Sequence, residues 1–217
     1  LENDKTFNNA GTFTNTSSYT DTADGTLTNT GKVDNQVNGT MTILGKLDNQ
    51  ATGEVSNAGT MTNKNILSNE GKFTNTGTLA NNATITNTVT LSNNGTYTDV
   101  ANATLTNSNV LDNVKGATMT ILGGLTNEKG ATLNNHGALT NKGNVTNNGT
   151  FNNSGTYDDV AEVTTVNTGA IDNKADAVMT IAGVLDTQNG TYNNDGNINI
   201  LKGGTIVDKK RNDGHAF

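Results

Sequence analysis

Cysteine, proline and tryptophan are absent from this chain of 217 residues, and each absence limits the fold. Without cysteine the protein forms no disulfide and offers no thiolate ligand to a metal ion. Proline cannot donate a main-chain hydrogen bond, so its absence suits strands with bonded neighbours on both edges. Arg211 is the single arginine and the net charge is −7, so we expect no nucleic acid and no anionic membrane as partner.

Apolar residues are also scarce, at 31% of the chain, and aromatic residues make up only 4%. No run of about 18 apolar residues occurs, which predicts no membrane insertion. The chain begins at Leu1 without a visible export signal, so we interpret it as an internal part of a longer exported protein. Such low hydrophobicity is typical of disordered chains, but here the apolar residues are strictly spaced, which favours an ordered repeat.

One six-residue phrase, Gly-x-Φ-x-Asn-x with Φ apolar, recurs along the whole chain. It is stated at 25–29, 71–75 and 149–153, as Gly-Thr-Leu-Thr-Asn, Gly-Lys-Phe-Thr-Asn and Gly-Thr-Phe-Asn-Asn. Strand side chains alternate between the two faces, so Gly, Φ and Asn point the same way, toward the interior. A single short strand of this kind cannot fold alone, and many in series predict a solenoid.

A larger repeat sets the number of strands in each coil. Tyr-x-Asp at Tyr19, Tyr97 and Tyr157 is followed each time by Met-Thr-Ile. The interval from Tyr97 to Tyr157 is shorter than that from Tyr19 to Tyr97 by three whole phrases, which is the loss of one three-sided coil. We therefore predict an all-β, three-faced parallel β-helix of about ten to eleven coils of 18 to 22 residues. A left-handed hexapeptide helix is the alternative, but its coils usually have a uniform length, so the variable coil length here favours the right-handed form. The predicted β-helix forms one unit over residues 1–207, with a frayed or capping tail at 208–217.

Asparagine follows Φ by two residues in most phrases. Stacked amides can accept a hydrogen bond from the coil on one side and donate to the coil on the other, which satisfies them at a buried corner. The role we predict for these residues is structural, with no catalytic, cofactor-binding or metal-binding site. This asparagine ladder includes Asn29, Asn35, Asn49, Asn75, Asn87, Asn107, Asn113, Asn127, Asn141 and Asn153.

The other polar residues give little sign of chemistry. Asp21, Asp99 and Asp159 occupy the ladder position, so we expect corner hydrogen bonds from them rather than a glycosidase pair of carboxylates. His136 stands alone in a turn and is expected to be solvated. Threonines flank Φ in Thr-x-Thr, as in ice-binding solenoids, but we expect this pattern on all three faces, whereas an ice-binding array needs one.

Repeated phrases such as Gly-Thr-Leu-Thr-Asn-Thr at 25–30 and Gly-Thr-Phe-Asn-Asn-Ser at 149–154 resemble the repeat regions of large bacterial surface adhesins. The closest resemblance is to filamentous-haemagglutinin-like exoproteins of two-partner secretion, and the next is to autotransporter passenger domains. The resemblance implies a secreted or surface-exposed shaft without enzymatic activity or cofactor, acting in attachment or biofilm formation. It implies that the parent protein meets glycans or surface proteins of host cells or biofilms.

Two alternatives to a passive shaft remain. The chain could itself bind glycans, although the predicted register places Tyr19, Tyr97 and Tyr157 inside, where they cannot stack on a sugar. A polysaccharide-acting enzyme would need a clustered acid site that the sequence does not show. The ends of a solenoid are open strand edges, so we also predict that the isolated chain associates end to end.

Overall fold

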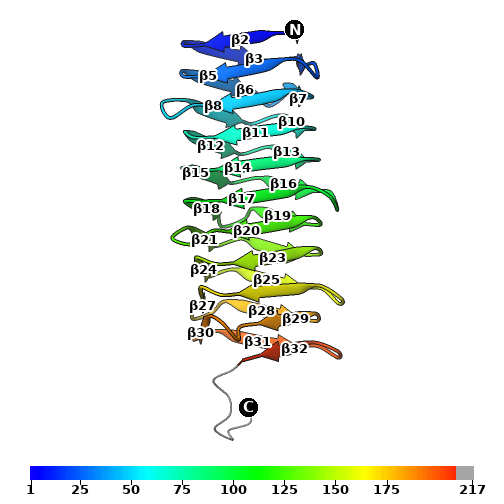
Figure 1. The fold of residues 1–217 in the computed structure, drawn as a ribbon, viewed down its shortest axis with the longest axis vertical. Helices are drawn as coiled ribbons and strands as arrows, with labels where there is room; N and C mark the ends of the chain where they lie inside the picture. Colours follow the sequence, from blue (N-terminus) through cyan, green and yellow to red (C-terminus); the bar gives the residue numbers. More distant parts are fainter. Residues whose placement is uncertain (209–217) are drawn as a thin grey trace, which may run out of the picture.

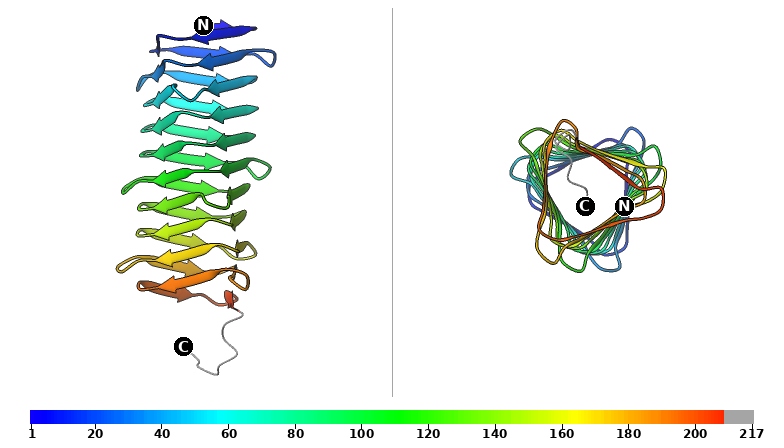
Figure 2. Two further views of the ribbon diagram at one scale, coloured as in Figure 1. Left: turned by 60° about the vertical axis from the view of Figure 1, so that its left-hand side comes forward. Right: turned by 90° about the horizontal axis from the view of Figure 1, so that it is seen from below.

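The computed structural model describes residues 1–208 as a three-sided rod built only of β-strands and turns (Figure 1). Viewed along the rod, the coils stack around one common axis, and successive coils are turned relative to one another (Figure 2). All strand pairs are parallel and join each strand to the third strand after it, so every coil contributes one strand to each of three sheets. The predicted fold class is confirmed, with sheets of 11, 11 and 10 strands.

We name the sheets A, B and C in the order in which the chain enters them. Sheet A contains β1 (Glu2–Asn3), β4 (Ser18–Asp21), β7 (Thr40–Ile43), β10 (Thr60–Asn63), β13 (Thr78–Asn81), β16 (Thr96–Asp99), β19 (Thr118–Ile121), β22 (Ala138–Asn141), β25 (Thr156–Asp159), β28 (Val178–Ile181) and β31 (Asn197–Ile200).

Sheet B contains β2 (Thr6–Asn9), β5 (Thr26–Asn29), β8 (Lys46–Asn49), β11 (Ile66–Asn69), β14 (Thr84–Asn87), β17 (Thr104–Asn107), β20 (Gly124–Asn127), β23 (Asn144–Asn147), β26 (Thr164–Asn167), β29 (Val184–Asp186) and β32 (Thr205–Val207). Sheet C contains β3 (Thr12–Asn15), β6 (Lys32–Asn35), β9 (Glu54–Asn57), β12 (Lys72–Asn75), β15 (Thr90–Asn93), β18 (Val110–Asn113), β21 (Thr132–Asn135), β24 (Thr150–Asn153), β27 (Ala170–Asn173) and β30 (Thr191–Asn194).

Nearly all strands have four residues, and the second and fourth point inward. The apolar second residues form one continuous core along the rod, with Tyr19, Phe73, Tyr97, Phe151 and Tyr157 among its largest fully buried side chains. The shortest coils consist of three such strands and three two-residue turns, as between the equivalent positions Asn63 and Asn81. Low overall hydrophobicity is sufficient here because each strand buries only one large side chain.

Turns of four residues explain the longer coils. The turns between strands have either two or four residues. The long ones come in groups, and within a group they follow every second strand and so fall at a different corner each time, as at 100–103, 114–117 and 128–131. In several of them the third residue has positive φ, for example Gly116 (87°) and Glu162 (69°). Coils with one long turn and coils with two therefore differ in length, which accounts for the variable coil length predicted from the sequence.

The second residue of most two-residue turns is glycine because the neighbouring coil leaves no space for a side chain. A Cβ built on Gly77 would lie 2.1 Å from the carbonyl oxygen of Gly59 in the preceding coil. The same contact recurs one coil on, where a Cβ on Gly95 would lie 2.2 Å from the Gly77 oxygen. Glycine is therefore required by the close approach of the backbones of neighbouring coils.

Residues from Ile198 to Val207 form the start of a further coil, through β31 and β32. The predicted tail lies, apart from Asp208, outside the described residues.

Candidate functional site

Two unbroken columns of asparagine amides follow the inner corners of sheets B and C. In each column an Nδ2 donates to the Oδ1 of the asparagine in the next coil, for example from Asn87 to Asn107 and from Asn107 to Asn127, both at 2.8 Å. Each Nδ2 also donates to a main-chain carbonyl, such as Asn107 to that of Thr132 at 3.0 Å. Nine of the ten ladder residues named from the sequence lie in these columns: Asn29, Asn49, Asn87, Asn107 and Asn127 in sheet B, and Asn35, Asn75, Asn113 and Asn153 in sheet C.

The corresponding column of sheet A is interrupted. Asn141 lies here and donates to the carboxylate of Asp159 at 2.7 Å rather than to another asparagine. Isoleucine occupies the position in the next coil, where Asp159 pairs with Ile181 and, in an earlier copy, Asp21 pairs with Ile43. Asp21 and Asp159 therefore each end a short run of amides: each accepts from the asparagine before it, and the isoleucine after it has no polar side-chain atom to continue the run.

A buried tyrosine lies beside each of these aspartates. The hydroxyls of Tyr19 and Tyr157 donate to Asp21 and Asp159, both at 3.4 Å, while the Tyr97 hydroxyl accepts from Asn81 at 3.3 Å. These tyrosines are fully buried, so none is placed to stack on a glycan.

Thr165 extends the third cluster and was not singled out from the sequence. It fills the inward position of β26 that is apolar in other coils, and hydrogen-bonds to both Tyr157 and Asp159. The signal in the sequence is a polar residue, Thr165, at a position where the phrase requires an apolar Φ. It is the second residue of the strand that follows the Tyr157 strand.

Burial sets the protonation of these groups. Desolvation raises the pKa of Asp99 and of Asp159 to about 6 against a partial opposing effect of hydrogen bonds, and it raises the pKa of Asp21 as well. Desolvation first, and then the adjacent carboxylate, raises the pKa of Tyr97 and Tyr157. Each aspartate also has one buried oxygen, Oδ2, without a hydrogen-bond partner.

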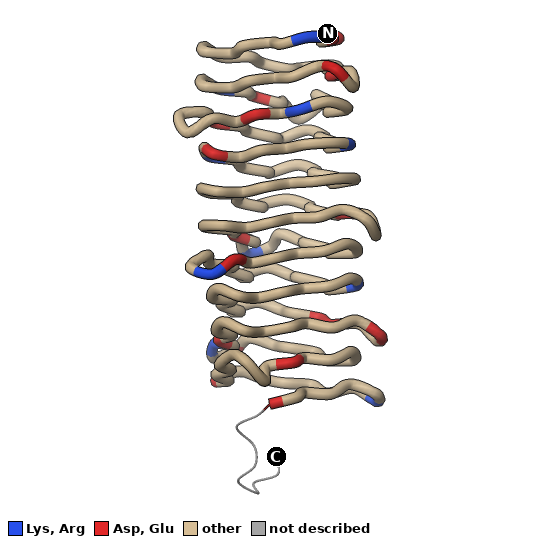
Figure 3. The backbone as a smooth tube through the Cα atoms, in the orientation of Figure 1, with Lys and Arg blue, Asp and Glu red and all other residues tan. Residues whose placement is uncertain are grey.

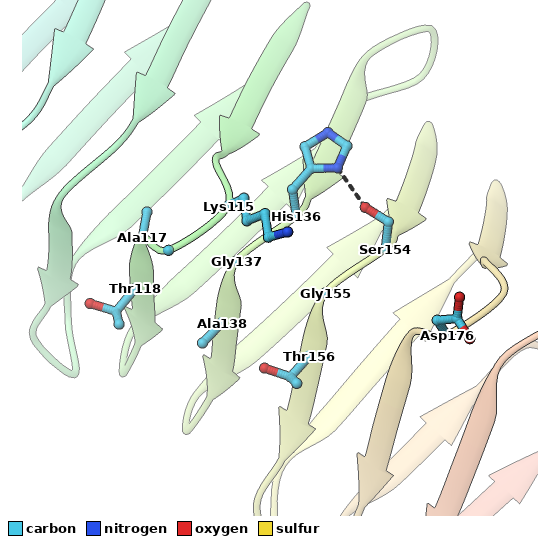
Figure 4. A pocket seen from close by; sticks show the side chains of 11 residues that line it. Lys115, Ala117, Thr118, His136, Gly137, Ala138, Ser154, Gly155, Thr156 and Asp176 are labelled. Atoms are coloured by element: carbon cyan, nitrogen blue, oxygen red, sulfur yellow. Dashed lines mark hydrogen bonds between the residues drawn. The ribbon is translucent and has the colours of Figure 1, made fainter.

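A shallow groove of about 420 Å³ lies on the corner between sheets C and A (Figure 4). Its two ends are the four-residue turns at 114–117 and 174–177, and its floor consists of the two-residue turns at 136–137 and 154–155. His136 is exposed, as expected, but it is not alone, because its Nδ1 shares a hydrogen bond with the Ser154 Oγ.

The groove lacks the parts of a Ser–His hydrolase. The main-chain N–H groups of Ser154 and Gly155 both donate to the carbonyl of Asn135, at 2.8 and 3.1 Å, so they are not available to stabilise an oxyanion. Within residues 1–208, no group of three or more His, Cys, Asp or Glu side chains could hold a metal ion. The groove is therefore a surface feature produced by unequal turn lengths.

Threonine is unevenly distributed over the three outer faces. Across β7, β10, β13, β16 and β19 of sheet A, nine of the ten outward residues are threonine and the tenth is Ala80. The strands of sheets B and C in the same coils have five and three, and both of those faces include charged residues. The expectation of one pattern on all faces was wrong. Val89, also flanked by threonines, is in a turn.

Charged residues are scattered along the rod (Figure 3). Two of the ion pairs, Lys32 with Asp34 and Lys46 with Asp48, join side chains two residues apart on one strand, at 3.6 and 3.1 Å. Such exposed pairs contribute little to stability. No helix among residues 1–208 is long and apolar enough to cross a membrane.

The repeated coil, the continuous core and the self-satisfied amide columns define a parallel β-solenoid. The family model of the haemagglutinin repeat matches residues 1–37, 30–127, 113–175 and 178–216. The chain belongs to the haemagglutinin-repeat family, which confirms the predicted resemblance to filamentous-haemagglutinin-like repeat regions. No curated protein and no solved structure was found to match it. Family and fold point to a structural, adhesin-like shaft rather than an enzyme.

Proposed function

We propose that this chain is part of the shaft of a secreted or surface-anchored bacterial adhesin, and that it holds a binding region away from the cell in attachment or biofilm formation. In this proposal, glycans or surface proteins of the host or biofilm are contacted by other parts of the parent protein. The observation that carries the proposal is the regularity of the rod. From β1 to β32 every connection has two or four residues, so no inserted loop or domain interrupts the coils.

A shaft is defined by its length, so removal of one coil is expected to shorten it without other loss. Deletion of 60–77 joins Gly59 to Thr78, which takes the place of Thr60 at the start of the sheet A strand. We expect the shortened protein to keep its β-sheet circular dichroism and to lose about 4.8 Å in maximum dimension, measured by small-angle X-ray scattering. An unchanged maximum dimension in a protein that keeps its β-sheet signal would contradict the proposal.

A glycan array tests whether the chain also binds. The shaft proposal expects no reproducible binding by the folded protein, since Tyr19, Tyr97 and Tyr157 are buried and the corner groove is shallow. Reproducible binding to one class of sugar would contradict a passive shaft and would favour a glycan-binding module. Circular dichroism on the same sample ensures that a negative result comes from folded protein.

The threonine array of sheet A supports a second candidate function, binding to ice. The β-solenoid fixes its hydroxyl and methyl groups on a flat lattice, about 4.8 Å apart between coils and about 6.7 Å apart along a strand. A fixed neutral lattice of this kind can order water in a way that a mobile or charged surface cannot. In the same coils the outward faces of sheets B and C carry fewer threonines and include charged residues.

Thermal hysteresis and inhibition of ice recrystallisation test this candidate. Thr98→Lys places a long charged side chain within the array and is expected to abolish the activity. Thr106→Lys is the matched control, at the same strand position in sheet B. No activity in the unmodified protein, or equal loss in the two variants, would rule out ice binding by this face.

A further inference from the structure

The three Tyr-x-Asp corners contain the only buried side-chain N or O atoms without a hydrogen-bond partner among residues 1–208. These are the Oδ2 atoms of Asp21, Asp99 and Asp159. They lie at one position of sheet A, in copies of one larger repeat, and each aspartate is almost fully buried, with at most 1% of its surface exposed. One buried oxygen without a partner, found at three equivalent sites, indicates a shared chemical state.

Asparagine at the same position of sheet A shows which hydrogen bond this oxygen lacks. The amide nitrogen of Asn63 donates to the carbonyl of Thr84 at 2.9 Å, and that of Asn3 donates to the carbonyl of Thr26 at 3.2 Å. In each case the acceptor is the first residue of the sheet B strand in the next coil. The equivalent carbonyls for the three aspartates belong to Lys46, Gly124 and Val184.

An ionised carboxylate cannot donate to a carbonyl, whereas a protonated carboxyl can donate as the amide does. We propose that the three Tyr-x-Asp corners are acid-stabilised joints of the shaft, in which Asp21, Asp99 and Asp159 are neutral carboxylic acids in mildly acidic solution and ionise, with loss of stability, as the solution becomes neutral.

Within the part of the chain that the structure describes, no cation compensates these carboxyls. Around Asp159 the contacting side chains are Tyr157 on its own strand, Asn141 on β22 and Thr165 on β26, while Ile181 lies opposite on β28. Tyr157 is the only titratable group among these four neighbours.

The other two aspartates have similar surroundings. Asn3 on β1, Tyr19 on its own strand and Ile43 on β7 surround Asp21. Asp99 accepts from the main-chain N–H groups of Leu122 and Gly123 in the turn of the next coil, and Tyr97 is on its own strand. The Lys46 ammonium is paired with Asp48 on the outer face, so it does not neutralise Asp21.

The direction of the pH effect follows from the pKa shift. The pKa of Asp159 is about 6 in the folded protein against 3.8 as the ordinary value. Below 3.8 both the folded and the unfolded chain hold the proton, and the full stability is present. Between 3.8 and 6 the unfolded chain releases the proton first, so the folded state loses stability as the pH rises. Above 6 both are ionised and the loss is complete.

A titration of the unmodified chain tests the proposal and does not require any variant to fold. We expect the ¹³C carboxyl signals of aspartate-labelled protein to show Asp99 and Asp159 titrating near 6, apart from the surface carboxylates. Signals are assigned with Asp159→Asn and with Asp158→Asn, whose outward side chain is adjacent in sequence. Titration of Asp159 in the ordinary range of an aspartate, at about 4, would overturn the proposal.

Urea unfolding at two pH values provides a second readout. Between pH 4.5 and 7.5 one such carboxyl lowers the folding equilibrium constant by roughly 20-fold. In Asp159→Asn the amide donates at any pH in this range, so this variant is expected to lose that share of the pH dependence. Asp158→Asn is expected to keep it. An equal pH dependence in both variants would contradict the proposal.

Discussion

Replacement of Asn107 by alanine is expected to lower the free energy of unfolding by about 2–4 kcal/mol, because it interrupts a buried ladder in the middle of the rod. The Asn107 side chain accepts from Asn87 and donates to Asn127, both at 2.8 Å, and it donates to the carbonyl of Thr132 at 3.0 Å. Its loss leaves the Asn127 oxygen without that donor and opens a cavity that the rigid neighbouring coils cannot fill.

The control is Asn144→Ala, at the exposed first position of β23. Asn144 points outward, so we expect its loss to change stability by less than about 0.5 kcal/mol. Chemical unfolding followed by circular dichroism measures both variants. Equal stability of the two variants would show that the amide column contributes nothing measurable at this position.

Gly77→Ala is expected to lower the free energy of unfolding by about 3 kcal/mol or more, since the new methyl group meets backbone and not a movable side chain. Its Cβ would lie 2.1 Å from the Gly59 oxygen and 2.5 Å from the Ala58 oxygen. To relieve this contact the two coils must separate, which weakens the parallel hydrogen bonds between β10 (Thr60–Asn63) and β13 (Thr78–Asn81).

Gly124→Ala is the matched control for this prediction. Gly124 lies on the outer face of β20, has no atom within 4 Å of the place that a Cβ would take, and does not need positive φ. Alanine at this site is expected to stabilise the protein by about 0.5–1 kcal/mol, because it restricts the unfolded chain. Thermal or urea unfolding of the two variants distinguishes steric exclusion from a general cost of losing glycine. Similar destabilisation by both would contradict the argument.

Much of this fold could be predicted from the sequence because the solenoid depends on local spacing. Φ and asparagine two residues apart specify the inner face, and the intervals between Tyr19, Tyr97 and Tyr157 give three strands per coil. Each of these inferences needs only the two-residue period of a strand and the fact that like residues stack on like in neighbouring coils.

The remaining features depend on which residues face each other between coils. Asp21 and Ile43 belong to different coils, and only the register shows that they are neighbours at the end of an amide run. The threonines likewise look evenly distributed along the chain. Each threonine can be assigned to one of the three faces only when the turn lengths are known. Val89 has the same flanking threonines as Tyr97 but is 39% exposed in a turn, so the Thr-x-Thr pattern alone does not separate strands from turns.

The amide columns also give the rod a direction. In the two inner columns of sheets B and C, each amide nitrogen donates to the asparagine of the next coil toward the C-terminal end, as from Asn9 to Asn29 and from Asn15 to Asn35. The amide dipoles are thus aligned along the axis, as peptide dipoles are in an α-helix. Two rods that meet end to end can continue these columns only head to tail, because a head-to-head contact would place acceptor against acceptor. The same side chains that stabilise each coil therefore give the rod a polarity along its axis.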